Sequence, residues 1–127
     1  MLKVDNIDVA YGDVQVLHGV SLDIKVGELV AVIGANGAGK TTLLKTISAL
    51  LRPIDGSISF EDEVISTQNP DRVVARGIVQ VPEGRLLFPD MSVRENLEMG
   101  AYLERDKAVL SERMNSVHEV FPLLADR

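Results

Sequence analysis

The octapeptide GANGAGKT, residues 34–41, constrains how the chain around it can fold. It fits the pattern G-x-x-x-x-G-K-[ST], in which glycines let successive backbone N–H groups converge on a phosphate. An apolar run, residues 29–33, precedes it, and apolar residues at helical spacing follow from Lys40 to Leu51. The order strand, glycine-rich turn, helix is the one that this mechanism requires. The stretch therefore predicts a phosphate-binding loop.

Each position of the loop has an expected role. Lys40 supplies a mobile positive charge to the β- and γ-phosphates, Thr41 offers a hydroxyl to Mg²⁺, and Thr42 can reach the α-phosphate. A dinucleotide fingerprint, G-x-G-x-x-G, cannot be laid on these glycines. The residues whose backbone is expected to surround the phosphates are Gly34, Ala35, Asn36, Gly37, Ala38 and Gly39.

The flanking sequence predicts both strands and helices. Alternation in residues 2–9 and 20–24 indicates half-buried antiparallel strands. Continuous apolar runs indicate strands buried on both faces over residues 29–33 and 77–81. A turn at Asp55-Gly56 should lead into a further alternating strand, residues 57–61. The expected helices cover residues 40–51, 70–76, 92 to about 103, where Ser92 and Glu95 form a capping box, and a last segment with Leu110, Met114, Val117 and Phe121 on one face.

Composition excludes several classes of function. The net charge of −6 argues against a nucleic-acid partner. Without cysteine there is neither a disulfide nor a thiolate metal site, and the two histidines, His18 and His118, stand alone, which argues against zinc. No apolar stretch approaches the roughly 20 residues that span a bilayer, and no signal peptide is evident. We expect a cytoplasmic protein.

Beyond the loop, several motifs carry a resemblance to a known family. Tyr11 and Val16 precede the loop, and LLFPDMSVRENL, residues 86–97, follows it. This order resembles the nucleotide-binding domain of ATP-binding-cassette (ABC) transporters over nearly the whole chain. GANGAGKTTLLKTI (34–47), VPEGR (81–85) and FPDMSVRENLEMGAY (88–102) are similar to the shorter, second form of the ATP-binding subunit of branched-chain amino-acid importers.

The resemblance implies an α/β fold, a P-loop NTPase core with an N-terminal antiparallel β subdomain and the start of a helical subdomain. Residues 1–127 would be the N-terminal part of one nucleotide-binding domain, with the β and P-loop core over about 1–90 and the helical subdomain over 91–127. Tyr11 would stack on adenine and Val16 would lie near the sugar. The alternatives are an ordinary edge-strand tyrosine and a core valine.

The resemblance also implies a loop residue that senses Mg²⁺ and the attacking water. Relatives commonly carry a glutamine there, six residues before the proline of an LFP or LYP stretch. Counting back from Pro89 gives Glu83, which would be a metal ligand and a catalytic residue together with Lys40. Gln80 is the alternative, although it lies inside the apolar run and is expected to belong to the strand.

Other parts of the family's catalytic apparatus have no match in this sequence. The only Asp-Glu pair, Asp62-Glu63, follows an alternating strand and is expected to be a hairpin turn. The acidic strand end, the serine-glycine-glycine signature and the later histidine would lie beyond Arg127. We therefore expect this chain to bind ATP·Mg weakly without hydrolysis and the parent protein to be a transport ATPase.

In the family, the expected partners are membrane-embedded permease subunits and a sister or identical ATPase subunit, at the inner face of the membrane. The expected cofactors are ATP and Mg²⁺, and the expected process is import of branched-chain amino acids. Three alternatives remain open: another solute, an export or non-transport role, and a nucleotide-binding switch without turnover.

Overall fold

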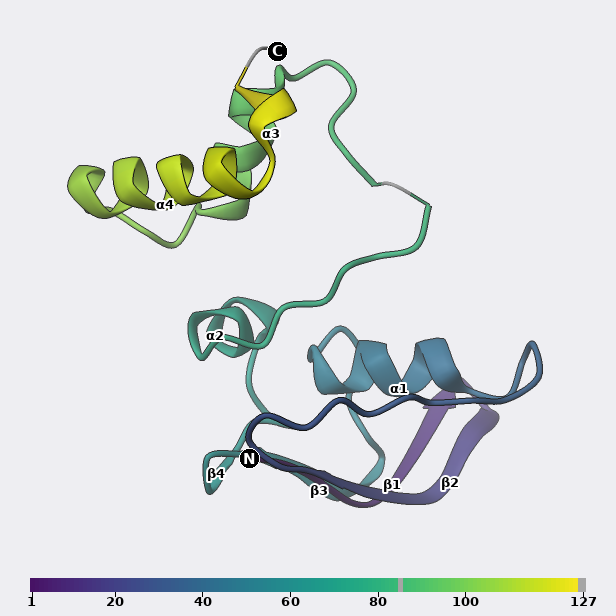
Figure 1. Ribbon diagram of the computed structural model, residues 1–127. Coiled ribbons are helices and arrows are strands. Elements are labelled where there is room, and N and C mark those ends of the chain that lie inside the picture. The colour runs from purple at the N-terminus through teal and green to yellow at the C-terminus, as the bar shows by residue number, and fades with distance from the viewer. Residues whose placement is uncertain (85, 126–127) are drawn as a thin grey trace. The chain divides into compact units, whose positions relative to one another are not determined.

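The computed structural model describes residues 1–84 and 86–125 (Figure 1). Two compact units follow one another along the chain, Met1–Gln80 and Val81–Arg127. The first holds the β-sheet and the glycine-rich loop, and the second is helical among its described residues.

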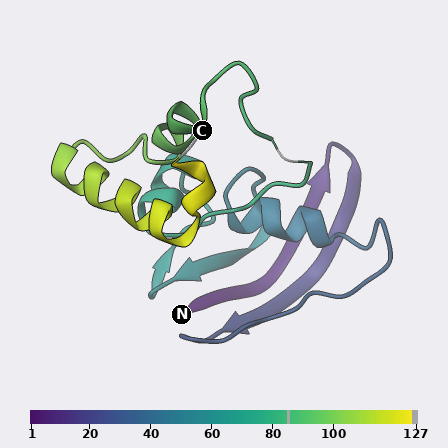
Figure 2. The ribbon, with the colours of Figure 1, turned by 45° about the horizontal axis from the view of Figure 1, so that its top comes forward.

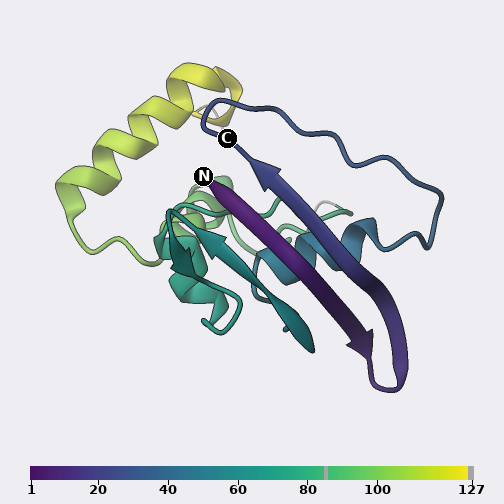
Figure 3. The ribbon, with the colours of Figure 1, turned by 90° about the horizontal axis from the view of Figure 1, so that it is seen from below.

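One antiparallel sheet organises the first unit. Its strands are β1 (Leu2–Tyr11), β2 (Val14–Ile24), β3 (Asp55–Phe60) and β4 (Glu63–Val64), in the order β2-β1-β3-β4 (Figure 3). The long β1–β2 hairpin confirms the antiparallel strands expected over residues 2–9 and 20–24. The imperfect alternation in β1 also has a structural cause, because the register of the β1–β2 pair shifts on both sides of Ile7 and Asn6 adopts a φ of 47°.

Two helices cover one face of this sheet. They are α1 (Lys40–Ile47) and α2 (Pro70–Ala75), and Figures 1 and 2 show both on the same side of the strands. The apolar core lies between the sheet and these helices, and burial there removes apolar surface from water. Its buried members are Val4, Ile7, Val9, Leu17, Leu43, Ala49, Ile58, Ile65 and Val73.

The two strands expected to be buried on both faces are absent from the sheet. Residues 29–33 run as irregular chain, with Leu29 97% and Ile33 93% exposed, and residues 77–81 are also irregular, with Val81 88% exposed. A strand of this kind needs a hydrogen-bonding neighbour on each side. Within the described residues the only sheet is the four-stranded antiparallel one, which offers these segments no partner. Their strand assignments were therefore wrong for this structure.

Two element boundaries in the first unit also differ from the prediction. Helix α1 ends at Ile47 rather than Leu51, because Ala49 takes a left-handed φ of 59° and the backbone N–H groups of Leu50 and Leu51 turn back to the carbonyl of Lys45. Asp55-Gly56 begins β3 instead of forming a separate turn.

The β3–β4 hairpin confirms the interpretation of Asp62-Glu63. Glu61 and Asp62 form the turn with φ values of 49° and 66°, and Glu63 is the first residue of β4. Arg76, which follows α2, pairs with the carboxylate of Glu63. Both acidic side chains are thus at an exposed turn.

The second unit contains α3 (Val93–Gly100), α4 (Lys107–Val120) and a short 3-10 helix, η1 (Pro122–Leu124). The capping box is confirmed: the Ser92 hydroxyl accepts from the Glu95 N–H at 3.3 Å, and the Glu95 carboxylate accepts from the Ser92 N–H at 2.8 Å. Helix α3 ends three residues before the predicted Leu103. In α4 the expected apolar face is half-buried at Leu110, Met114 and Val117.

Asn96 fastens the turn before α3 to the helix. Its amide nitrogen lies 3.0 Å from the Phe88 carbonyl and 3.2 Å from that of Met91, and its Oδ1 accepts from the Phe88 N–H at 2.9 Å. One side chain therefore holds residues 88–92 against the first turn of α3.

The capping box predicts a pH dependence of α3. The backbone N–H of Ser92, followed by its hydroxyl, stabilises the ionised carboxylate and lowers the pKa of Glu95 below its ordinary value of 4.5. The stabilisation is complete above pH 4.5 and is lost as the pH falls through the lowered value. Glu95→Gln, which can still cap, should flatten this loss. Amide hydrogen exchange in α3 between pH 6 and about pH 3 measures it.

Glu112→Gln, on the exposed surface of α4, is the matched control and should leave the pH profile of α3 unchanged. Equal flattening by both variants would show that the profile arises from general charge and not from the capping box.

Candidate phosphate-binding site

The glycine-rich loop joins the irregular segment before Gly34 directly to the first turn of α1. Ala38 donates its N–H to the Ala35 carbonyl at 3.1 Å, which closes a tight turn. Gly39 is the N-cap of α1, with φ at 92°, and its carbonyl accepts the first helical bond from Leu43 at 2.8 Å. The loop therefore ends where the helix presents its free N–H groups and positive dipole end.

Lys40 folds back over the loop that precedes it. Its ammonium donates to the carbonyls of Gly34 and Ala35, both at 2.7 Å. The charge is thus fixed at the helix N-terminus by two backbone dipoles. An anion there would meet both the ammonium and the loop N–H groups, which is the arrangement that charge-assisted phosphate binding requires.

The two threonines after Lys40 differ in exposure. Thr41 is exposed in the first turn of α1, so its hydroxyl is available to a ligand. Thr42 is buried, with 6% of its surface exposed, and its carbonyl accepts from the Thr46 hydroxyl at 2.7 Å. The expected role of Thr41 toward a metal fits this placement, and that of Thr42 toward the α-phosphate stays a prediction.

Gly39 holds the end of the loop against β2. A Cβ built on Gly39 would lie 2.5 Å from Cδ2 of Leu17 and 3.6 Å from Cγ1 of Val16. Val16 therefore lies beside the loop and also packs against the core, and its expected place near the sugar stays a prediction. Only glycine combines the left-handed backbone with this close approach.

Tyr11 lies at the other end of the β1–β2 hairpin from the chain terminus, paired with Val14. The residue is 45% exposed, so it is accessible to a ligand. The role of Tyr11 in binding adenine stays a prediction.

The two candidates for the metal-sensing residue are placed very differently. The Gln80 carboxamide oxygen accepts from the Ser48 hydroxyl at 2.6 Å, at the C-terminal end of α1. Lys40 is roughly 12 Å away along the helix axis, at a rise of about 1.5 Å per residue. Glu83 is exposed in a turn with Gly84 and belongs to the second unit. The structure thus directs Gln80 to the far end of α1, and the role of Glu83 stays a prediction.

The described residues contain no cluster of three or more acidic, histidine or cysteine side chains that could hold a metal. A Mg²⁺ site made of protein carboxylates is therefore not found in the described part of the chain. The exposed hydroxyl of Thr41 is nevertheless a hard oxygen donor, and Mg²⁺ commonly takes one or two protein ligands together with phosphate oxygens and water. The donor set fits a metal that arrives with a nucleotide.

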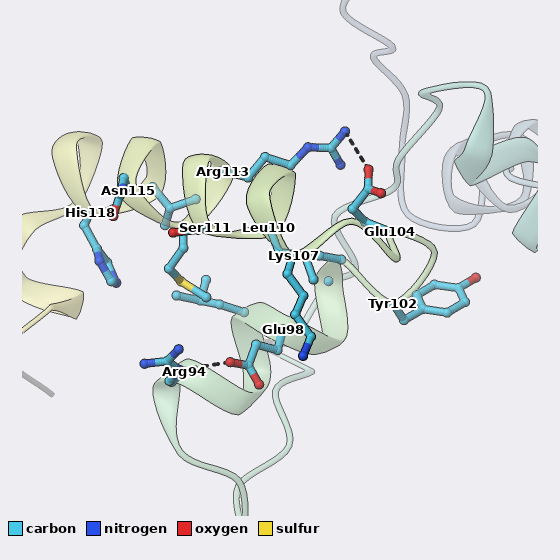
Figure 4. A pocket seen from close by; sticks show the side chains of 15 residues that line it. Arg94, Glu98, Tyr102, Glu104, Lys107, Leu110, Ser111, Arg113, Asn115 and His118 are labelled. Atoms are coloured by element: carbon cyan, nitrogen blue, oxygen red, sulfur yellow. Dashed lines mark hydrogen bonds and ion pairs between the residues drawn. The ribbon is translucent and has the colours of Figure 1, made fainter.

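A hollow of about 970 Å³ lies elsewhere, between α3 and α4 (Figure 4). Its walls combine apolar side chains such as Leu110 and Met114 with ion pairs, Arg94 to Glu98 at 2.9 Å and Arg113 to Glu104 at 3.5 Å. All its lining residues fall between Arg94 and His118, so it contains no part of the glycine-rich loop.

The profile of the ABC transporter family matches residues 17–125, which is most of the chain. The chain belongs to the ABC transporter family. The described residues contain the N-terminal antiparallel strands, the glycine-rich loop and the helices that follow.

Individual relatives fit this assignment. The chain is 42% identical over its whole length to the high-affinity branched-chain amino acid transport ATP-binding protein BraG of Pseudomonas aeruginosa and covers 54% of that protein. It is 34% identical over 96% of its length to the sn-glycerol-3-phosphate import ATP-binding protein UgpC of Ruegeria pomeroyi, of which it covers 34%.

Solved structures show the same relation. An ATP-binding subunit of an ABC transporter superposes with a TM-score of 0.83 at 30% identity, covering the whole chain and 52% of that structure. The dimeric cassette MJ0796 bound to ADP and Pi superposes with a TM-score of 0.71 at 25% identity, over 89% of the chain and 53% of that structure. The chain thus spans about half, or less, of the proteins that it matches. Among the described residues, no helix is both long and apolar enough to cross a membrane.

Gly39 and Gly37 form a matched pair for testing the loop. Both have positive φ, 92° and 86°, but only a Cβ at Gly39 would collide with a neighbour. Gly37→Ala should cost about 1 kcal/mol through backbone strain, and Gly39→Ala about 2–4 kcal/mol through strain and overpacking. Urea unfolding monitored by circular dichroism measures both. Equal losses would contradict the tight contact with β2.

Proposed function

We propose that this chain is the nucleotide-binding part of an ABC transporter ATP-binding subunit, and that residues 34–42 bind ATP together with Mg²⁺. The observation that carries the proposal is the position of Lys40, whose ammonium is held by the carbonyls of Gly34 and Ala35 at the N-terminus of α1. The family match and the ATP-binding names of the relatives support it.

In this proposal each part of the loop binds a different part of the nucleotide and its metal. Backbone N–H groups of residues 34–39 donate to the β-phosphate, and the N-terminus of α1 contributes its dipole, typically about 0.3–1 kcal/mol for a partly exposed anion. Lys40 leaves the loop carbonyls and donates to β- and γ-phosphate oxygens. Thr41 supplies a hydroxyl ligand to Mg²⁺, which when bound offsets phosphate charge.

The remaining site residues complete the proposal. Tyr11 stacks on the adenine, supported by its exposed position at the end of β1. Glu83 acts at the metal and the γ-phosphate, supported by the hydrogen bond that keeps the alternative, Gln80, on Ser48. A carboxylate at this position repels the γ-phosphate unless Mg²⁺ is present, so Glu83 makes nucleotide binding depend on the metal more strongly than a glutamine would.

We propose further that the complete protein hydrolyses ATP to drive import, and that the transported solute is a branched-chain amino acid. The 42% identity to BraG, which extends over the whole chain, supports this solute. The similarity to UgpC, whose name gives sn-glycerol-3-phosphate import, favours another imported solute as the second candidate. Permease subunits and a second ATP-binding subunit are the proposed partners, at the cytoplasmic face of the membrane. The dimeric cassette among the similar structures supports the second subunit.

For residues 1–127 alone we propose binding without turnover. Asp62 and Glu63 lie at the exposed β3–β4 turn, and Glu63 pairs with Arg76. In that position they do not provide the acidic strand end that orients water and metal in P-loop ATPases. ATP hydrolysis by purified residues 1–127 that is abolished by Lys40→Ala would contradict this proposal.

Lys40→Ala tests the nucleotide site directly. Loss of a charge-assisted contact should weaken ATP binding by about 10- to 100-fold. Lys45→Ala is the matched control, because it removes the same charge from the same helix five residues later. Isothermal titration of ATP·Mg compares the two variants. A similar loss of affinity in both would indicate a general effect of charge or helix stability and would contradict the proposed site.

Glu83→Gln and Gln80→Ala separate the two candidates for the metal-sensing residue. Glu83→Gln should raise ATP affinity in EDTA and so reduce the ratio between affinities with and without Mg²⁺. Gln80→Ala should change that ratio less. Titrations with ATP in Mg²⁺ and in EDTA measure it, and a larger change in Gln80→Ala would overturn the assignment of Glu83.

A further inference from the structure

The pairing of β1 with β2 is irregular close to the connection between the two strands. Val9 opposes Leu17, but the pairing then shifts by one residue, which leaves Val16 as an extra residue of β2. This arrangement is a β-bulge, in which two consecutive residues of one strand oppose one residue of the other. A Cβ built on Gly39 would lie close to the side chains of both Val16 and Leu17. The bulge therefore directs two neighbouring side chains of β2 toward the end of the glycine-rich loop.

The bulge also decides which residue of β2 opposes Tyr11. Without the extra residue, Tyr11 would oppose Gln15, whereas its observed partner is Val14. Directly opposite residues of an antiparallel pair lie on the same face of the sheet, and successive residues of a strand alternate between the two faces. Val14 therefore shares the face of Tyr11, and Gln15 lies on the other face.

Tyr11 and Val14 form an exposed apolar surface at the end of the hairpin. Val9, two residues before Tyr11 in β1, is buried in the core between the sheet and the helices, so Tyr11 and Val14 lie on this inner face. They are nevertheless 45% and 66% exposed. Figures 1 and 2 show the connection between β1 and β2 at the same end of the first unit as the start of α1. The sheet thus presents uncovered apolar side chains at the end where the glycine-rich loop enters the helix.

Val16 connects this surface to the loop. Val14 is two residues before Val16 in β2, a separation of about 7 Å at the usual rise of a strand. Val16 itself lies beside Gly39. In a nucleotide, the ribose and the α-phosphate separate the base from the β-phosphate. A surface that binds the base must therefore be displaced from the loop that binds the phosphates, and Tyr11 and Val14 are displaced from it along β2.

We propose that Val14 is a base-binding residue, which together with Tyr11 forms an apolar platform for the base of a nucleotide held at residues 34–42. Tyr11 stacks on the base, and the side chain of Val14 adds apolar area that the bound base removes from water. The bulge at Val16 places a valine rather than a glutamine in this position. This inference rests on the function proposed above, including the role of Tyr11.

The test uses the full-length protein and compares ATP with inorganic tripolyphosphate, which carries the phosphates without a base, both in the presence of Mg²⁺. Isothermal titration gives the ratio of the tripolyphosphate dissociation constant to that of ATP. Val14→Ala should lower this ratio about 3- to 10-fold, because it removes apolar contact with the base. The affinity for tripolyphosphate should stay within about 2-fold of the parent protein, as is usual for an exposed residue outside the phosphate site.

Gln15→Ala is the matched control. It truncates the adjacent residue of the same strand, which lies on the opposite face, so the ratio should remain that of the parent protein. Val14→Thr keeps the branched shape and the preference for a strand but exchanges a methyl group for a hydroxyl. It should also lower the ratio, which separates the loss of apolar contact from a change in strand stability. Circular dichroism shows that each variant is folded before titration.

The inference and the proposed function fail in different ways. An unchanged ratio in Val14→Ala, equal losses of affinity for ATP and tripolyphosphate, or a decrease in Gln15→Ala at least as large as in Val14→Ala would overturn the inference. An unchanged ratio in Tyr11→Ala would also overturn it. Unchanged affinity of Lys40→Ala for both ligands would instead refute the proposed function. Lowered ratios in the Val14 and Tyr11 variants, with weaker binding of both ligands in Lys40→Ala, support both.

Discussion

The close approach of Gly39 to Leu17 connects the glycine-rich loop to the sheet. Leu17 is a buried residue of β2 and Gly39 is the N-cap of α1, so one contact fixes the helix start against the core. Because no side chain separates them, the last peptide of the loop lies directly on the strand, with Val16 alongside. The direction of the free N–H groups of α1, and hence the place where an anion can bind, follows from this packing.

Lys40 adds a positive charge at the N-terminus of α1. A lysine at the first helical position would ordinarily oppose the positive end of the helix dipole, but its ammonium is drawn back onto the carbonyls of Gly34 and Ala35. The loop therefore presents N–H donors and also holds the Lys40 ammonium, which can exchange its carbonyl partners for phosphate oxygens.

Local patterns predicted the parts of the structure that local interactions stabilise. The capping box at Ser92, the proline-led α2 and the β1–β2 hairpin depend on residues close in sequence, and all were confirmed. The runs 29–33 and 77–81 have the composition of inner strands, but a strand forms only beside a partner, which a local pattern does not contain. Ser48 was missed for a related reason: its partner is 32 positions away. A polar residue within an apolar run, Gln80, was the available signal.

Helix α1 connects the contact between Gly39 and β2 to the hydrogen bond between Ser48 and Gln80. At its N-terminus, Gly39 packs against β2 and Lys40 begins the helix. At its C-terminus, the C-cap residue Ser48 donates a hydrogen bond to the Gln80 side chain. Because an α-helix is stiff over two turns, the separation of its ends is set by residue number alone. An insertion or deletion within residues 40–47 would also rotate Ser48 by about 100° per residue, away from Gln80. The length of α1 therefore decides whether Ser48 meets Gln80 while Gly39 stays packed on Leu17.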